Sequence, residues 1–289
     1  MLVTRRGGKL ELITQPDHAA VAGALAARWG NRAFSTPAAR EALLCAAVHH
    51  DDGWLELDTR PAYNATARRP AHFTEVPLTE SVGPYGRGVE SVYARDPLAG
   101  ALCSMHWSGF STSRWGAGGA NPAQDPLALE VVASQEARWM PALREAWGNR
   151  GRRSEFDAQT WHAYEVLQAV DLISLGLGLI DTDAPAPADG GETVPVAATL
   201  RTLDQEPGPR TVASVPLAAG GDVVTLTLIP RGPARVELNP YPLAGTEAAI
   251  EIPLRRLADR AYESPEEAAA AYHEAMPETR QVTVVPPGH

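Results

Sequence analysis

The segment Asp181–Glu192 divides the chain into two parts with different hydrophobic periodicity, and this change constrains the fold most. The segment is rich in Asp, Ala, Pro and Gly. Before it, apolar residues recur at helical spacing, whereas after it short runs alternate like half-buried strands. Helices followed by strands indicate the α+β class. The sequence therefore predicts a helical domain over residues 1–182, a linker at 183–193 and a β-rich domain over 194–289.

The two ends of the chain are expected to meet in one sheet. Residues 1–13 are typical of a short hairpin around Arg5-Arg6-Gly7-Gly8, and two strands alone are only marginally stable. We therefore expect this hairpin to join the C-terminal sheet, whose sequence also contains a helix that opens at Ser264-Pro265. The strands of that sheet are expected at Val194–Leu203, Thr211–Leu217, Val223–Ile229, Arg235–Asn239, Ala249–Ile252 and Val282–Val285.

Charge and composition exclude several classes of partner. The formal net charge is −10, whereas a general nucleic-acid binder needs a basic footprint. No segment reaches the roughly 18 consecutive apolar residues of a membrane span, and the N-terminus lacks the apolar core of a secretory signal. We expect a soluble, cytoplasmic protein without a nucleic-acid or membrane partner. Cys45 and Cys103 lie in apolar helical runs and are expected to be buried free thiols.

Four polar residues interrupt apolar helical faces at three places in the first part of the chain. His18 starts the apolar stripe of one predicted helix. His50 and Asp51 end the stripe of the next helix, which Gly53 is expected to stop. Asp171 lies in a later helix, in one of the most apolar stretches of the sequence. An ionised aspartate on an apolar face costs several kcal/mol unless it is paired or bound to a metal.

Two kinds of partner would satisfy these residues. Imidazole and carboxylate together suit Zn, Fe, Mn, Co or Ni, so the first interpretation is a divalent transition metal, present as one or two ions. The alternative is an ion pair between Asp171 and an arginine, with His18 bonded to a backbone carbonyl.

The order of these residues, His18, then His50-Asp51, then Asp171, resembles that of the HD (histidine–aspartate) superfamily of helical metal-dependent phosphohydrolases. The resemblance implies that these four residues hold the metal. The local pattern His50-Asp51-Asp52-Gly53-Trp54, after Gln15-x-x-His18 and before Asp171-Leu172-Ile173-Ser174, is similar to a bacterial family, the domain-of-unknown-function family 3891. This second resemblance covers nearly the whole chain and implies a fold and a ligand set, but no substrate.

Further polar residues lie near the implied ligands. His106 ends the apolar face of a helix that opens at Asp96-Pro97. HD-superfamily members with two metals use extra histidines between the His-Asp pair and the last Asp. The resemblance therefore implies a role for His106, and secondarily for His72, at a second metal or at the substrate. His49 and Asp52 flank the His50-Asp51 pair. They are expected either to hydrogen-bond to a residue that binds the metal or to be solvated.

The polar stretch from residue 54 to 95 is rich in Pro and Gly and is expected to form a long loop. Both of its ends are tethered near the proposed metal, so we expect it to pass across the mouth of the site. Its arginines Arg60, Arg68 and Arg69 are natural clamps for an anionic substrate. The alternative for them is a solvated surface.

Three functions are compatible with these residues. The first is a metal-dependent hydrolase of HD type that acts on a phosphate ester or similar small anionic substrate. In that reaction Asp51 or Asp52 would orient the attacking water, and His106 would bind phosphate or a second metal. The second function is that of a di-iron oxygenase, which needs additional histidine ligands. The third is a non-catalytic, metal-stabilised binding module whose β-rich part is the interaction surface.

Overall fold

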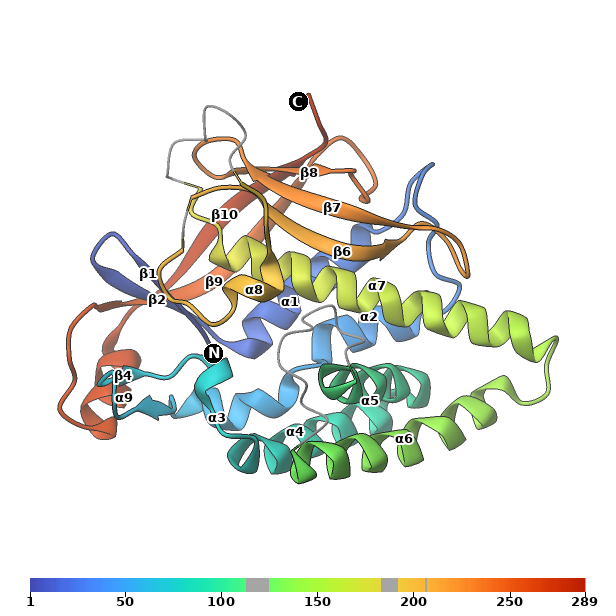
Figure 1. The fold of residues 1–289 in the computed structure, drawn as a ribbon, viewed down its shortest axis with the longest axis horizontal. Coiled ribbons are helices and arrows are strands. Elements are labelled where there is room, and N and C mark those ends of the chain that lie inside the picture. The colour runs from blue at the N-terminus through green and yellow to red at the C-terminus, as the bar shows by residue number, and fades with distance from the viewer. Residues whose placement is uncertain (113–124, 183–191, 206, 289) are drawn as a thin grey trace.

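A computed structural model describes residues 1–112, 125–182, 192–205 and 207–288. The fold is mixed α+β, as predicted, with a curled sheet on one side and most helices on the other (Figure 1). The helices are α1 Gln15–Arg28, α2 Arg40–His49, α3 Leu55–Thr59, α4 Leu78–Arg95, α5 Pro97–Ser111, α6 Pro126–Trp147, α7 Arg153–Leu179, α8 Val196–Thr199 and α9 Pro265–Glu274, with 3-10 turns η1 Asp52–Trp54 and η2 Phe73–Glu75. The strands are β1 Leu2–Arg6, β2 Lys9–Ile13, β3 Tyr63–Asn64, β4 Arg69–Pro70, β5 Val194–Pro195, β6 Arg210–Pro216, β7 Val223–Pro230, β8 Arg235–Asn239, β9 Ala248–Ala258 and β10 Pro277–Val285.

The N-terminal hairpin joins the C-terminal strands in one eight-stranded sheet, which confirms the expectation for residues 1–13. The strand order is β1-β2-β9-β10-β8-β7-β6-β5. Strand β2 runs antiparallel to β9, with Leu10 opposite Leu257 and Leu12 opposite Arg255. The hairpin therefore gains a third strand from a part of the chain that is very distant in sequence.

The prediction of a strand over Val194–Leu203 is largely wrong. Only Val194–Pro195 pairs, with β6, and helix α8 follows directly where the strand was expected to continue to Leu203. Apolar residues in a short run do not distinguish a buried strand from a buried helix turn. The adjacent Ala197 and Ala198 have high helix propensity, which favours the observed turn.

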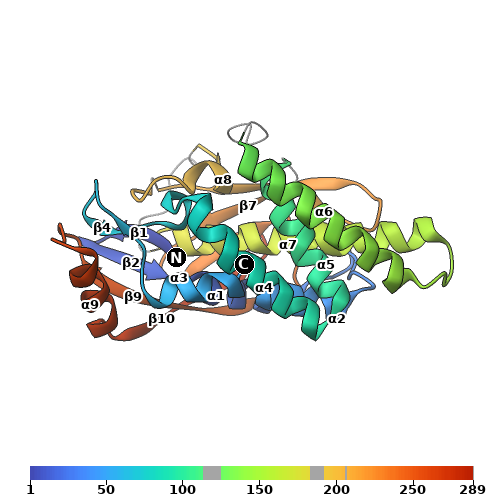
Figure 2. The same cartoon turned by 90° about the horizontal axis from the view of Figure 1, so that it is seen from below.

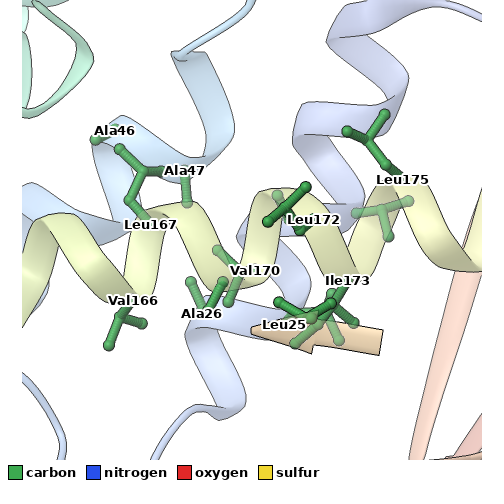
Figure 3. Close-up of a cluster of buried hydrophobic side chains, with 14 of the residues drawn as sticks. Leu25, Ala26, Ala46, Ala47, Val166, Leu167, Val170, Leu172, Ile173 and Leu175 are labelled. Atoms are coloured by element: carbon green, nitrogen blue, oxygen red, sulfur yellow. The ribbon is translucent and has the colours of Figure 1, made fainter. Parts of the chain in front are cut away.

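Helices α1 and α7 pack against the sheet, and one buried core runs from the helices into the strands. Helix α7 contacts β6, and α1 contacts β9. In Figure 3, Leu25 of α1 lies beside Ile173 of α7, and Ala46 of α2 lies beside Leu167 of α7. The same buried cluster includes Leu228 of β7. Helices α4 and α6 lie on the other side of this helical layer, from which Figure 2 is viewed.

The C-terminal end of α7 is held on the sheet by two arginines. Arg6 of β1 donates from Nη2 to the carbonyls of Leu179 and Ile180, at 3.1 and 2.9 Å. Arg280 of β10 donates in the same way to the carbonyls of Leu177 and Gly178, at 3.1 and 2.9 Å. Both guanidinium groups also bond to the buried carboxylate of Glu11 on β2. Cations at this end complement the negative pole of the helix, so the helix that carries Asp171 is fixed at its far end.

The stretch from residue 54 to 95 is not a loop, contrary to our prediction. It forms η1, α3, the short β3–β4 hairpin, η2 and the 18-residue helix α4. Helix α4 contains Pro84 as well as several glycines, and these residues are helix breakers in most sequences. Its helical face is nevertheless apolar, because Tyr85, Val89 and Val92 are buried at helical spacing.

Cys45 and Cys103 are free thiols, the second buried and the first half-buried. Residues 183–191 of the predicted linker lie outside the described residues. Of the helices that the structure describes, none combines the length and apolarity that a membrane crossing requires.

Candidate metal centre

Five polar side chains from four parts of the fold converge in the interior of the helical layer. His18 lies on the first turn of α1, His50 and Asp51 follow α2, His106 lies on α5 and Asp171 lies on α7. All five are buried, with relative exposures between 1% and 4%. We call this group the His/Asp centre. It contains the four residues that the order along the chain implied, together with His106.

The end of helix α2 lets the adjacent residues His50 and Asp51 face the same point. Helix α2 ends at His49, and His50 keeps helical torsion angles as its C-cap. Asp51 then adopts φ −111° and ψ 15°, in the bridge region between helix and strand. Our expectation that Gly53 stops the helix is therefore wrong, because the helix has ended four residues earlier and Gly53 lies within η1.

Gly53 instead allows the backbones of η1 and α4 to approach each other closely. A Cβ atom at Gly53 would lie 2.6 Å from the carbonyl oxygen of Pro84 and from Cα of Tyr85. A Cβ atom at Gly88 would lie 2.4 Å from the backbone nitrogen of Gly53. Such close approach is available only to glycine. The contact presses η1 against α4 and so fixes Asp51, which immediately precedes η1.

The distances within the His/Asp centre fit ligands of one ion. Nε2 of His18 lies 2.9 Å from Oδ1 of Asp171, and Nε2 of His50 lies 3.4 Å from the same oxygen. Oδ2 of Asp51 lies 3.7 and 3.6 Å from these two nitrogens. Nε2 of His106 lies 3.8 Å from Oδ2 of Asp171. Two ligand atoms about 2.1 Å from a common ion lie roughly 3.0 Å apart at a right angle and roughly 3.4 Å apart at the tetrahedral angle.

Hydrogen bonds at Nδ1 orient two histidines so that Nε2 is the nitrogen left to bind a metal. Ser174 donates from Oγ to the carbonyl of Asp171 at 2.8 Å, so its oxygen accepts from Nδ1 of His18 at 2.6 Å. Nδ1 of His50 donates to the carbonyl of Ala47 at 3.0 Å. Within the described part of the chain, neither Nε2 atom has a hydrogen-bond partner of acceptable geometry. Metal-binding histidines are commonly oriented in this way through their other nitrogen.

The charges in the centre are unbalanced in a way that a cation would correct. Burial by itself lowers the pKa of His50, but the carboxylates of Asp51 and Asp171 outweigh it and raise the pKa to about 9. Burial also acts to raise the pKa of Asp171, yet the imidazoles of His18 and His50 hold that pKa well below its usual range. Burial raises the pKa of Asp51 and lowers that of His106 to about 3. The centre thus attracts positive charge to Asp171, and its buried histidines and aspartates could hold a metal ion.

Two residues that support the centre had no role assigned from the sequence. Gln15 donates from Nε2 to Oδ2 of Asp51 at 3.2 Å, and Ser174 orients His18 as described above. Gln15 stands in the segment Gln15-x-x-His18, and Ser174 ends Asp171-Leu172-Ile173-Ser174. Their spacing of three residues from a ligand, which puts them on the same helix face, was the available signal.

A cavity of about 150 Å³ adjoins the His/Asp centre on one side. Its polar end is formed by Gln15, His18, Asp51, His106 and Asp171, and its wall is formed by Trp54, Phe73, Phe110 and Leu175. The polar lining residues are buried, whereas Phe73 and Phe110 are half-buried. The solvent-accessible part of the described lining is therefore aromatic.

Three of the other candidate residues lie away from this cavity. His49 and Asp52 form a partly exposed pair, with Nδ1 of His49 3.0 Å from Oδ2 of Asp52, and Arg95 joins them at 3.4 Å from that oxygen. His72 is buried as the N-cap of η2, where its Nδ1 accepts from the backbone nitrogen of Thr74 at 3.2 Å. The structure does not bring these residues to the His/Asp centre.

The three arginines proposed as clamps also lie elsewhere, each beside a glutamate. Arg60 is 3.3 Å from Glu266, and Arg68 pairs with Glu263. Arg69 pairs with Glu75 at 2.7 Å and is largely buried. None of the three is part of the described cavity lining. What the 54–95 stretch does contribute to the cavity is aromatic, namely Trp54 and Phe73.

Comparison with known proteins places the chain in a family. The family model described as "Protein of unknown function (DUF3891)" matches residues 1–259. Neither the curated proteins nor the solved structures gave a match. The matched span contains the whole His/Asp centre and the aromatic wall of its cavity, and it ends before α9 and β10. The chain belongs to the DUF3891 family.

Proposed function

We propose that the chain is a metal-dependent hydrolase of the HD type, in which His18, His50, Asp51 and Asp171 hold one divalent transition-metal ion. The observation that carries the proposal is the pair of Nε2 atoms of His18 and His50, which are buried, face two carboxylates and have no hydrogen-bond partner of acceptable geometry among the described residues. Together with His106, these residues offer three imidazoles and two carboxylates, a donor set that suits Fe, Mn, Zn, Co or Ni. When bound, such an ion would act as a Lewis acid and lower the pKa of a water molecule toward neutrality.

The sharing of His50 favours a single ion over two. Two groups of possible ligands can be drawn in the described residues, one with His18 and Asp51 and one with His106 and Asp171, and both require His50. Nδ1 of His50 is engaged with the carbonyl of Ala47, so only Nε2 is available. One imidazole nitrogen binds one ion, so the two groups describe the same centre. This geometry supports hydrolysis over di-iron oxidation, because the latter requires two irons.

The adjoining cavity favours catalysis over a purely structural metal. Structural sites are closed by protein ligands, whereas catalytic sites keep a position open for water or substrate. Here the cavity reaches His18, Asp51, His106 and Asp171 on one side. A small ester or similar anion entering the cavity would meet the centre directly.

Different side chains of the centre would have different roles in hydrolysis. Asp51, held by Gln15 at 3.2 Å, would orient the attacking water, because it borders the cavity. Asp52 points to His49 and Arg95, so we do not assign it this role. His106 stays neutral at physiological pH, since burial lowers its pKa to about 3. It can complete the coordination or accept a hydrogen bond from the substrate.

Two adjacent histidines provide a matched test. We expect the purified wild-type protein to carry about one ion per chain by elemental analysis and to hydrolyse at least one simple p-nitrophenyl ester. His50→Gln should lose both the ion and the turnover, while keeping its helical circular dichroism. His49→Gln should keep both, because His49 belongs to the outer pair with Asp52. Full ion content in His50→Gln, or two ions per wild-type chain, would contradict the proposal.

A further inference from the structure

We infer that the substrate is small, carries at most one negative charge and places an apolar group against Trp54, Phe73 and Phe110. This inference rests on the proposed function, because it concerns what reaches the ion at the His/Asp centre. It separates the expected substrates from nucleotides and polyphosphates. Three observations carry it, which are the wall, the charge and the volume of the cavity.

The wall of the cavity opposite the polar end is aromatic and well ordered by its own contacts. The rings of Trp54 and Phe73 meet edge to face, with centroids 6.3 Å apart and planes at 83°. Phe110 meets His106 in the same manner, with centroids 4.7 Å apart and planes at 76°. Such pairs hold aromatic rings in place. An apolar substituent is favoured beside these rings, whereas a polar one would lose its hydration without gaining hydrogen bonds.

The charge at the polar end is balanced once a divalent ion is present. Asp51 and Asp171 supply two negative charges, which equal the charge of the ion, and neutral imidazoles add none. Among the described residues that line the cavity, none is a lysine or an arginine. Arg60, Arg68 and Arg69 lie beside Glu266, Glu263 and Glu75, respectively. A dianionic phosphate or a polyphosphate would therefore bring more negative charge than the described lining can compensate.

The volume limits the size of the group that enters. The cavity measures about 150 Å³. Sites for drug-sized ligands typically begin at about 300 Å³. A short acyl or alkyl group therefore suits this space better than a nucleoside.

A series of short carboxylates tests the inference by binding rather than by turnover. The ion-loaded protein would be titrated with acetate, propionate, butyrate and AMP in a calorimeter. The three carboxylates offer the same head group to the ion, so differences in affinity report on the wall. Each buried methylene should strengthen binding about fourfold, so butyrate should bind about 15-fold more tightly than acetate. AMP should bind more weakly than butyrate.

Two variants locate the effect on the aromatic wall. Phe73→Ala should lose most of the 15-fold gain of butyrate over acetate. Phe156→Ala should retain it, because Phe156 is also a partly buried phenylalanine but lies on α7 outside the cavity lining. The wild-type series is informative even if Phe73→Ala folds poorly.

The outcomes separate this inference from the function on which it rests. Equal affinity for acetate and butyrate, or tighter binding of AMP than of butyrate, would overturn the substrate class and leave the ion centre in place. An equal loss of the gain in both phenylalanine variants would remove the assignment to the wall. A protein that takes up no ion would overturn the proposed function and the substrate class together.

Discussion

The contact between η1 and α4 offers the sharpest test of how the fold positions the His/Asp centre. We consider the substitution Gly88→Ala. The new Cβ would lie 2.4 Å from the backbone nitrogen of Gly53 and 2.7 Å from its Cα, whereas ordinary contacts begin near 3.4 Å. The two segments must therefore move apart by about 1 Å, the difference between 3.4 and 2.4 Å. Both clashing atoms belong to backbone, so no side chain can rotate to relieve them.

The energetic effect can be bounded from both sides. Overpacking of this kind typically costs about 1–3 kcal/mol, and replacing glycine by alanine inside a helix returns about 0.5–1 kcal/mol. We expect Gly88→Ala to lower the free energy of unfolding by about 1–2 kcal/mol, measured by urea denaturation. Gly86→Ala is the matched control on the same helix. Its Cβ would meet only ring carbons of Trp107, at 3.7 and 3.8 Å, so this variant should be neutral or slightly more stable.

Gly88→Ala should also weaken the binding of an ion at the His/Asp centre. Asp51 immediately precedes η1, so a shift of η1 moves Asp51 relative to His18 and His50. We expect the affinity of Gly88→Ala for the ion to fall about 10- to 100-fold, as is typical when groups that hold metal ligands are displaced. Gly86→Ala should bind the ion like the wild type. If Gly88→Ala and Gly86→Ala have the same stability and the same ion affinity, the reasoning from the glycine contact is refuted.

Two further predictions concern single side chains. Ser174→Ala removes the acceptor for Nδ1 of His18, so ion affinity should fall about 10- to 100-fold in a competition assay with a chelator, and an unchanged affinity would show that Ser174 does not orient His18. His72 gives a pH dependence, because burial lowers its pKa to about 3 in the folded state from 6.5 in the unfolded chain. Above pH 6.5 the ring is neutral in both states, but between pH 6.5 and 3 only the unfolded chain takes up the proton. The free energy of unfolding therefore falls by up to about 1.4 kcal/mol for each unit by which the pH is lowered in this range. His72→Gln should flatten the dependence of stability on pH, measured by urea denaturation between pH 7 and 4. The control His273→Gln, at an exposed histidine, should not. Equal slopes in both variants would contradict the assignment of this pH dependence to His72.

The sequence was sufficient for the positions that depend on local pattern. Hydrophobic periodicity identified the faces on which His18 and Asp171 lie, and the instability of an isolated hairpin placed residues 1–13 in the sheet. Periodicity reports which face of an element is buried, however, and not which element covers it. The approach of His106 to Asp171, at 3.8 Å, follows from the packing of α5 against α7 and could be inferred only from a resemblance.

The features that were mispredicted share a physical cause. Pro84 and the glycines of α4 concealed a helix whose stability comes from tertiary contacts, above all the backbone contact at Gly53 and Gly88. The arginines at 68 and 69 were assigned to a substrate because their glutamate partners are not visible in a linear pattern. The partner of Arg68, Glu263, is contributed by the other end of the chain.

The pairing of β2 with β9 has a consequence for the synthesis of the protein. The strands are joined across the sheet by residues 245 positions apart, such as Glu11 and Arg256. At about 5–20 residues per second, a ribosome needs roughly 12 to 50 s to translate that interval. Throughout this interval the hairpin, with Leu10 and Leu12, has no third strand, and by its end the helices that carry His18 and Asp171 have been translated. The first hairpin of the nascent chain is therefore open to wrong strand pairing during this interval, and the helical layer can assemble before the sheet is complete.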